Sequence, residues 1–150
     1  MKTFILATVA AVSTAYNHGF PDDNAFHAGC HLDATITFTS CADAIGKATQ
    51  LINMNVDTDS EYKGQMSIYD SGSDWIYSKR TTYNGKYIDD QLFEFAMDGP
   101  SCKVTARSYS ESNSYLDNNV NFCNLWNVVS RITADISYYA HNCSQNEHGP

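Results

Sequence analysis

The residues between Gly64 and Ser110 constrain the fold more than any other stretch, because their apolar side chains recur at every second position. Met66 and Ile68 alternate with polar neighbours, and Val104 and Ala106 do the same. Ser-Gly-Ser, Asn-Gly and Asp-Gly-Pro turn signals divide the stretch at 71–73, 84–85 and 98–100. A period of two with short turns predicts a four-stranded antiparallel meander.

Helical patterns flank this meander. Residues spaced three and four apart predict a helix over 41–54, which Ser40 caps with Asp43 three positions later. That apolar stripe consists of Cys41, Ala44, Ile45, Ala48, Leu51 and Ile52. A shorter helix is predicted around 117–130. Short strands are predicted over 34–40, with Ile36 and Phe38 on one face, and along the alternation from Ile132 to Tyr138.

The resulting order is strand, helix, four-stranded meander, short helix and strand. We therefore predict an α+β domain with one main helix packed on an antiparallel meander, stabilised by disulfides. Cystatin-like and nuclear-transport-factor-like folds, in which a sheet grasps one helix, share this element order. The expected core places Phe93, Phe95, Val104 and Ala106 against the helix stripe.

The first fifteen residues have the layout of a secretory signal peptide: Lys2, an apolar run, and small residues at Ser13 and Ala15. We predict cleavage before Tyr16 and a secreted, extracellular protein. The expected organisation is a signal peptide over 1–15, an N-terminal loop over 16–33, a globular domain over 34–143 and a tail over 144–150.

Composition and charge limit the classes of partner that the protein is expected to bind. The chain has 43% hydrophobic and 17% charged residues, which is typical of a folded globule. Its formal net charge of −8 disfavours nucleic acid and anionic membranes as partners. No second apolar run reaches about 20 residues, so no membrane span is expected after the signal.

The five cysteines are Cys30, Cys41, Cys102, Cys123 and Cys143. Five is an odd number, so two bridges would leave one thiol that is either buried or joins two chains. We predict that Cys102 pairs with Cys123, and that Cys41 pairs with either Cys143 or Cys30. Asn142 begins an Asn-Cys-Ser sequon and is the candidate glycosylation site.

No metal or cofactor is expected. His27 and His31 have a spacing of four, but their segment has no helical pattern. His18 would be the third residue of the mature chain, a position that suits copper or nickel, and we interpret it as incidental. The acidic stretch 57–61 lacks the glycine and the final acid of a calcium loop.

The aromatic residues, 13% of the chain, are the main binding candidates. Trp75 and Tyr77 share a face of their strand, and Tyr83 and Tyr87 flank a hairpin turn. Rings with polar tips on a sheet suit sugar stacking, a protein partner or self-association. Ordinary strand composition also explains them.

Catalytic motifs are missing from the sequence. No nucleophile elbow, zinc-protease motif or glycine-rich phosphate loop is present. Asp90 and Glu94 share one face of a strand and are the only carboxylate pair considered for acid–base chemistry on a sugar. A polar, outward face of the sheet is the simpler interpretation.

The segment from Ser101 to Val129 resembles a segment of small secreted proteins from protists and microalgae. The matching residues are Cys102, Lys103, Val104, Ala106, Asp117, Asn121, Phe122, Cys123, Asn124 and Leu125. Arg107 and Val129 stand in the regions where that family has further cysteines. The resemblance implies secretion and a shared fold, and it implies no activity.

The leading hypothesis is a non-enzymatic extracellular protein that binds or self-assembles through its sheet face. Its partner would be an extracellular protein or carbohydrate, or another copy in a cell covering, matrix or filament. The alternative is a small-ligand carrier or protease-inhibitor-like module, and a small hydrolase using Asp90 and Glu94 is the third hypothesis. A deep apolar cavity between helix and sheet would favour the carrier.

Overall fold

The computed structural model describes residues 18–55, 64–114 and 118–144. These ranges hold six strands and two helices, in the order β1 (Gly29–Ile36), α1 (Cys41–Asn53), β2 (Gly64–Ser71), β3 (Trp75–Thr82), β4 (Ile88–Asp98), β5 (Ser101–Ser110), α2 (Val120–Val129) and β6 (Ile136–His141). The predicted signal peptide, the acidic stretch 57–61 and Asp117 lie outside the described residues.

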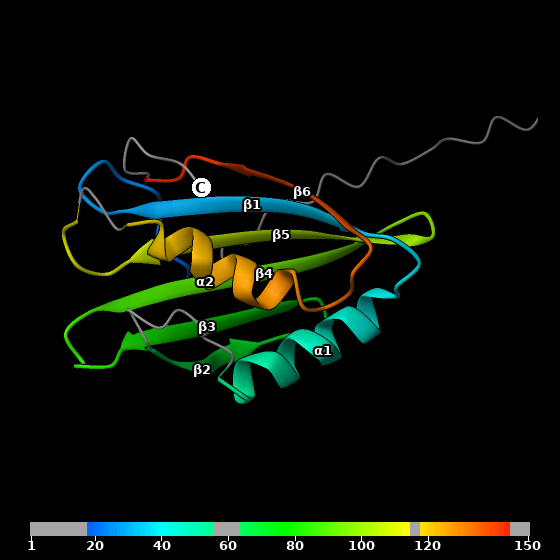
Figure 1. Cartoon of the computed structure of the whole chain (residues 1–150), viewed down its shortest axis with the longest axis horizontal. Helices are drawn as coiled ribbons and strands as arrows, with labels where there is room; N and C mark the ends of the chain where they lie inside the picture. The colour runs from blue at the N-terminus through cyan, green and yellow to red at the C-terminus, as the bar shows by residue number, and fades with distance from the viewer. Residues whose placement is uncertain (1–17, 56–63, 115–117, 145–150) are drawn as a thin grey trace, which may run out of the picture.

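The strands form one antiparallel sheet in the order β2-β3-β4-β5-β1-β6 (Figure 1). Strands β2 to β5 are the meander that the alternating pattern predicts. β1 pairs with β5 from Gly29 to Ile36, and β6 pairs with the other side of β1. The predicted α+β class is confirmed, while the likeness to cystatins or nuclear transport factors stays an analogy of element order.

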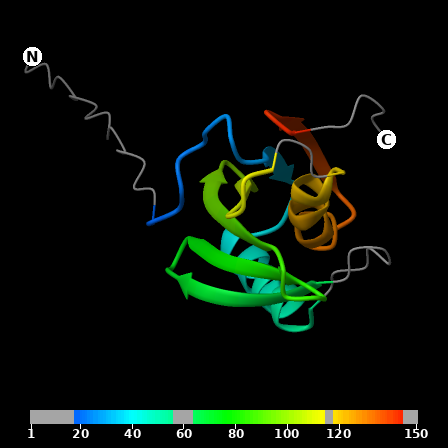
Figure 2. The ribbon, with the colours of Figure 1, turned by 90° about the vertical axis from the view of Figure 1, so that its left-hand side faces the viewer.

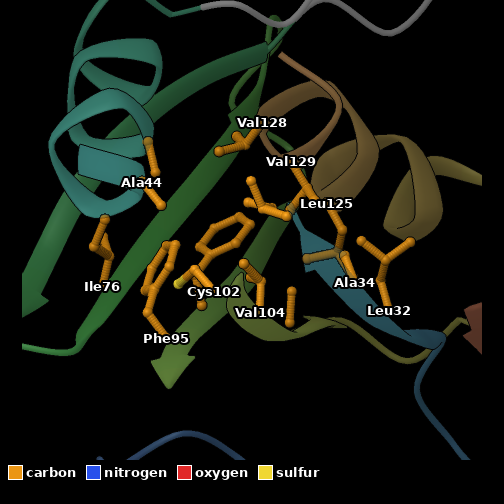
Figure 3. Packing of buried hydrophobic residues seen from close by; sticks show 14 of the residues in the cluster. Leu32, Ala34, Ala44, Ile76, Phe95, Cys102, Val104, Leu125, Val128 and Val129 are labelled. Carbon is orange, nitrogen blue, oxygen red and sulfur yellow. The ribbon is translucent and has the colours of Figure 1, made fainter. Parts of the chain in front are cut away.

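Both helices lie on one face of the sheet, which we call the helix face (Figure 1). Alternate side chains of β1, β4 and β5 point to this face and pack against α1 and α2 (Figure 3). Phe93, Phe95, Val104 and Ala106 are buried there with Ala44, Ala48 and Ile52 of α1. The predicted packing of the meander against the helix stripe is therefore confirmed.

The end strands differ from the prediction. β1 begins at Gly29, so the predicted N-terminal loop ends at residue 28. β1 stops at Ile36 because the backbone of Phe38 is left-handed (φ 56°), which ends the predicted strand over 34–40 early. The Phe38 ring is exposed and does not share the buried face of Ile36. The last strand begins at Ile136, later than the alternation from Ile132 indicates.

The helix α1 begins where the sequence predicts. Ser40 has an extended backbone, and its Oγ accepts a hydrogen bond from the Asp43 N–H at 3.1 Å. The Ser40 hydroxyl also donates to Asp43 Oδ2 at 2.7 Å. This cap satisfies one of the N–H groups that a helix leaves without an internal partner.

Replacing Ser40 by alanine is expected to lower the free energy of unfolding by about 1 kcal/mol, because the N-terminal turn of α1 loses its acceptor. Urea denaturation of both proteins measures the change. Ser40→Asp keeps an acceptor at the same position and should retain most of the stability. Equal losses in both variants would contradict the capping role.

The disulfides join Cys41 to Cys102 and Cys30 to Cys143. The predicted bond between Cys102 and Cys123 is therefore wrong, as is a bond from Cys41 to Cys143 or Cys30. Cys102 lies near the start of β5, where α1 begins, whereas α2 begins beside Ser108 and Ser110 at the other end of β5. Cys123 on α2 belongs to neither bond.

A buried polar network holds the start of α2 on the sheet. The Asp89 carboxylate lies 3.5 Å from Arg80 Nη1 and accepts hydrogen bonds from Ser110 Oγ at 2.8 Å and Asn124 Nδ2 at 3.0 Å. Asn121 accepts from Ser108 Oγ at 2.6 Å and donates to Ser110 Oγ at 3.0 Å. All six side chains are buried, so α2 is placed by hydrogen bonds as well as by apolar packing.

Neither helix that the structure describes is long and apolar enough to cross a membrane.

Candidate binding face

The face of the sheet opposite the helices, here called the outer face, carries the side chains that alternate with the core residues. They include Trp75, Tyr77 and Lys79 of β3, Asp90, Leu92 and Glu94 of β4, and Arg107 and Tyr109 of β5. This face combines aromatic rings with charges of both signs. It is therefore chemically distinct from the apolar helix face.

The segment 18–28 lies along the outer face, on the side of the sheet away from α2 (Figure 2). Phe20 is buried there against Tyr77, Leu92 and Tyr109, and the Arg107 guanidinium lies 5.1 Å from the centre of the Phe20 ring. This segment therefore forms part of the folded domain.

The predicted binding residues fall into two groups. Trp75 and Tyr77 do share the outer face, but His18 stacks on Trp75 at 4.1 Å and Phe20 covers Tyr77. Tyr83 and Tyr87 lie at the β3–β4 turn, with 89% and 41% of their surfaces exposed. The structure thus leaves the turn tyrosines accessible and covers the two strand aromatics.

Tyr69 of β2 presents an accessible ring beside the outer face, with 66% of its surface exposed. Its ring centre lies 5.1 Å from that of Tyr77 and 5.1 Å from Lys79 Nζ. Lys79 lies 2.6 Å from Glu111 and 3.1 Å from Asp90, and the Tyr77 hydroxyl donates to Asp90 at 2.9 Å. We call these five residues the Tyr69 platform.

Electrostatics fix the protonation of this platform. Burial raises the pKa of Tyr77, and the hydrogen bond to Asp90 raises it further. Burial alone would lower the pKa of Lys79, but the hydrogen bonds to Glu111 and Asp90 raise it overall. At neutral pH the platform therefore presents a neutral tyrosine and a charged ammonium.

Sequence reasoning missed Lys79 and Glu111 as members of a site. Lys79 has the same parity as Trp75 and Tyr77 on one strand, and this signal could have identified it. Glu111 follows the end of β5, and its approach to Lys79 depends on how β3, β4 and β5 align in the sheet. No local pattern in the sequence carries that information.

The carboxylate pair considered for catalysis lies on the outer face but is divided between two sets of contacts. Asp90 points to this outer face, as the strand parity predicts, and it is buried within the Tyr69 platform. Glu94 lies 3.5 Å from Arg107 Nη2 and 3.5 Å from His18 Nε2.

The three candidate histidines have separate surroundings. His18 contacts Trp75, the His27 Nδ1 lies 2.7 Å from the carbonyl oxygen of Ser110, and His31 Nε2 lies 2.6 Å from Asp23. Asn142 is exposed at the end of β6, beside the bonded Cys143. Glycosylation of Asn142 stays a prediction.

No known family model, curated protein or solved structure matches this chain.

Proposed function

We propose that this is a secreted, non-enzymatic extracellular protein that binds a carbohydrate or protein partner at the Tyr69 platform. The observation that carries the proposal is the exposed Tyr69 ring, held on a strand beside the charged groups of Lys79 and Glu111. Its setting would be a cell covering, a matrix or another extracellular assembly.

An exposed ring beside fixed polar groups suits this kind of recognition. The apolar face of a sugar ring packs on an aromatic ring, and its hydroxyls need donors and acceptors at the rim. Tyr69 offers the ring, the Lys79 ammonium donates, and the Glu111 carboxylate accepts. Because Lys79 is held by two carboxylates, little side-chain freedom remains to be lost on binding.

The extracellular setting rests on two independent features. The signal-like N-terminus predicts export from the cytosol. Two disulfides are typical of an oxidising compartment, and they join segments that are 61 and 113 residues apart. A thiol-reducing cytosol would not preserve such bonds.

The other two hypotheses gain no specific support. A carrier needs an apolar cavity between helices and sheet, and in the described part of the chain core side chains fill that space (Figure 3). A hydrolase needs two carboxylates poised on one substrate, whereas Asp90 and Glu94 each hold other charged partners.

Replacing Tyr69 by alanine is expected to weaken partner binding about tenfold, because the ring is the accessible contact surface of the platform. Binding of the mature protein to an array of oligosaccharides and to extracellular matrix proteins identifies the partner, and titration with the strongest binder measures the change.

The matched control is Tyr83→Ala, which removes a more exposed tyrosine from the β3–β4 turn. It should leave the affinity unchanged, and both variants should melt at the temperature of the parent protein. If Tyr83→Ala removes binding and Tyr69→Ala does not, the binding site lies at the turn and the proposed platform is wrong.

A further inference from the structure

The two edge strands of the sheet differ in how their outer main-chain groups are covered. On β2, the Asn55 side chain accepts a hydrogen bond from the Met66 N–H at 2.7 Å, and the pairing register shifts between Ile68 and Asp70. Side-chain cover, bulges and charges protect edge strands from pairing with other chains. β6 contains no acidic residue, lysine, arginine or proline, and its pairing with β1 is regular.

The direction of the main-chain groups on β6 follows from its pairing with β1. The Thr37 N–H donates to the carbonyl oxygen of Asp135 at 3.2 Å, so Asp135 and every second residue after it direct these groups toward β1. Ile136, Tyr138 and Ala140 therefore direct their N–H and C=O groups away from the sheet. No strand among the described residues lies beyond them.

We propose that a second copy of this chain pairs with this edge, so that two sheets join into one through antiparallel β6 strands. A two-fold axis perpendicular to the sheet passes between the two copies of Tyr138. The surface lies at the edge opposite β2, the strand that carries Tyr69. The proposal therefore goes beyond the proposed function and does not depend on it.

The register follows from counting outward main-chain groups. With Tyr138 on the axis, Ile136 lies opposite Ala140 of the partner subunit, and Ala140 lies opposite the partner's Ile136. Each outward-facing residue of β6, including Tyr138, then donates its N–H to the residue opposite it on the second strand and accepts a hydrogen bond from that residue. An axis at Tyr139 would leave Ile136 outside this ladder, so Tyr138 is the better centre.

The side chains fit the same register. Tyr138 is 50% exposed on the helix face, and its ring centre lies 4.3 Å from that of Trp126, which stacks on Phe122 at 6.1 Å. Pairing at Tyr138 brings two such aromatic rows together across the axis, which stabilises a strand pair.

The charged side chains at this edge also fit the proposed register. Asp135 lies opposite the partner subunit's His141 in this register, so the ends of the ladder place an acid beside a base. Between these ends, the residues of β6 from Ile136 to His141 include no Asp or Glu, although the whole chain has a net charge of −8. Contact at this edge therefore avoids the repulsion that the rest of the acidic surface would impose.

Sedimentation equilibrium of the mature protein tests the proposal with three variants. Tyr138→Lys places two ammonium groups opposite each other on the axis, and Ala140→Pro removes an outward N–H without removing a hydrogen bond to β1. Each is expected to raise the dimer dissociation constant at least about tenfold. Tyr139→Lys is the matched control, because Tyr139 points to the outer face opposite Ser137 of the partner subunit.

Cross-linking tests the register directly. In a Cys123→Ser background, Tyr138→Cys is expected to form a disulfide-linked dimer on oxidation, and Tyr139→Cys is not. This experiment also decides the matter if Tyr138→Lys lowers the melting temperature, since Tyr138 contacts Trp126. Retained sugar or protein binding by a monomeric variant would show that the platform acts independently of pairing.

A parent protein that stays monomeric at high concentration would overturn the proposal. Binding of a different extracellular protein at β6 by such a monomer would also overturn it, because the proposed partner is a second copy of this chain. Dimers that survive both Tyr138→Lys and Ala140→Pro would show that copies meet elsewhere. Cross-linking through Tyr139→Cys in place of Tyr138→Cys would overturn the register.

Discussion

Replacing Asp89 by alanine is expected to lower the free energy of unfolding by about 3–5 kcal/mol. The substitution takes the Asp89 carboxylate away from the Arg80 guanidinium, and both side chains are almost fully buried. It also removes the acceptor of Ser110 and Asn124. Urea denaturation monitored by tryptophan fluorescence measures the change.

A matched control comes from the same strand. Asp98→Ala removes an exposed carboxylate at the end of β4 and should change stability by less than about 0.5 kcal/mol. The double variant Arg80→Met, Asp89→Leu removes both charges and should lose less stability than Asp89→Ala alone. A loss below about 1 kcal/mol in Asp89→Ala would show that water reaches this network in solution.

The network also explains why the polar sequence around α2 folds as a helix. Asn121 and Asn124 are poor helix formers, yet both are buried and bonded to Ser108, Ser110 or Asp89. Tertiary hydrogen bonds therefore compensate for the low helix propensity of these two asparagines.

Loss of Asp89 should consequently loosen α2 more than α1. Hydrogen exchange of the backbone amides in the two helices measures this difference.

The sequence predicted those elements whose burial is periodic along the chain. The meander and α1 have one regularly buried side, and the period of apolar residues reports it directly. The first half of β1 escaped prediction because Gly29, His31 and Asp33 are polar or small, and their strand is fixed by pairing with β5 and β6. Such pairing joins residues far apart in sequence and leaves no local signal.

The candidate site was predictable to a similar extent. Strand parity places Trp75 and Tyr77 on one face, and the structure agrees. It could not reveal that Phe20 covers Tyr77, because that contact joins segments more than 50 residues apart. Strand parity also predicts that the adjacent Asp89 and Asp90 point to opposite faces, but it could not reveal their partners, which are Ser110 for Asp89 and Tyr77 for Asp90.

The disulfide pairing of the cysteines shows most clearly that contacts between distant residues leave no local signal in the sequence. It also leads to the second prediction of a large loss of stability. Removing the Cys41–Cys102 bond by replacing both residues with alanine is expected to cost about 2–5 kcal/mol of unfolding free energy. The bond closes a segment of 61 residues and ties the first residue of α1 to β5. Alanine is preferred to serine because Cys102 is fully buried, and a hydroxyl there would lose its hydration.

Cys123→Ala is the control for this pair, because Cys123 is in neither disulfide and its side chain is only partly buried. It should change stability by less than about 1 kcal/mol. Peptide mapping of the unreduced protein should recover Cys41 linked to Cys102 and Cys30 linked to Cys143. A peptide linking Cys102 to Cys123 would instead require the start of α2 to lie near the start of β5. The hydrogen bonds of Asn121 and Asn124 place it at the opposite end of that strand, so such a peptide would overturn the placement of α2 described above.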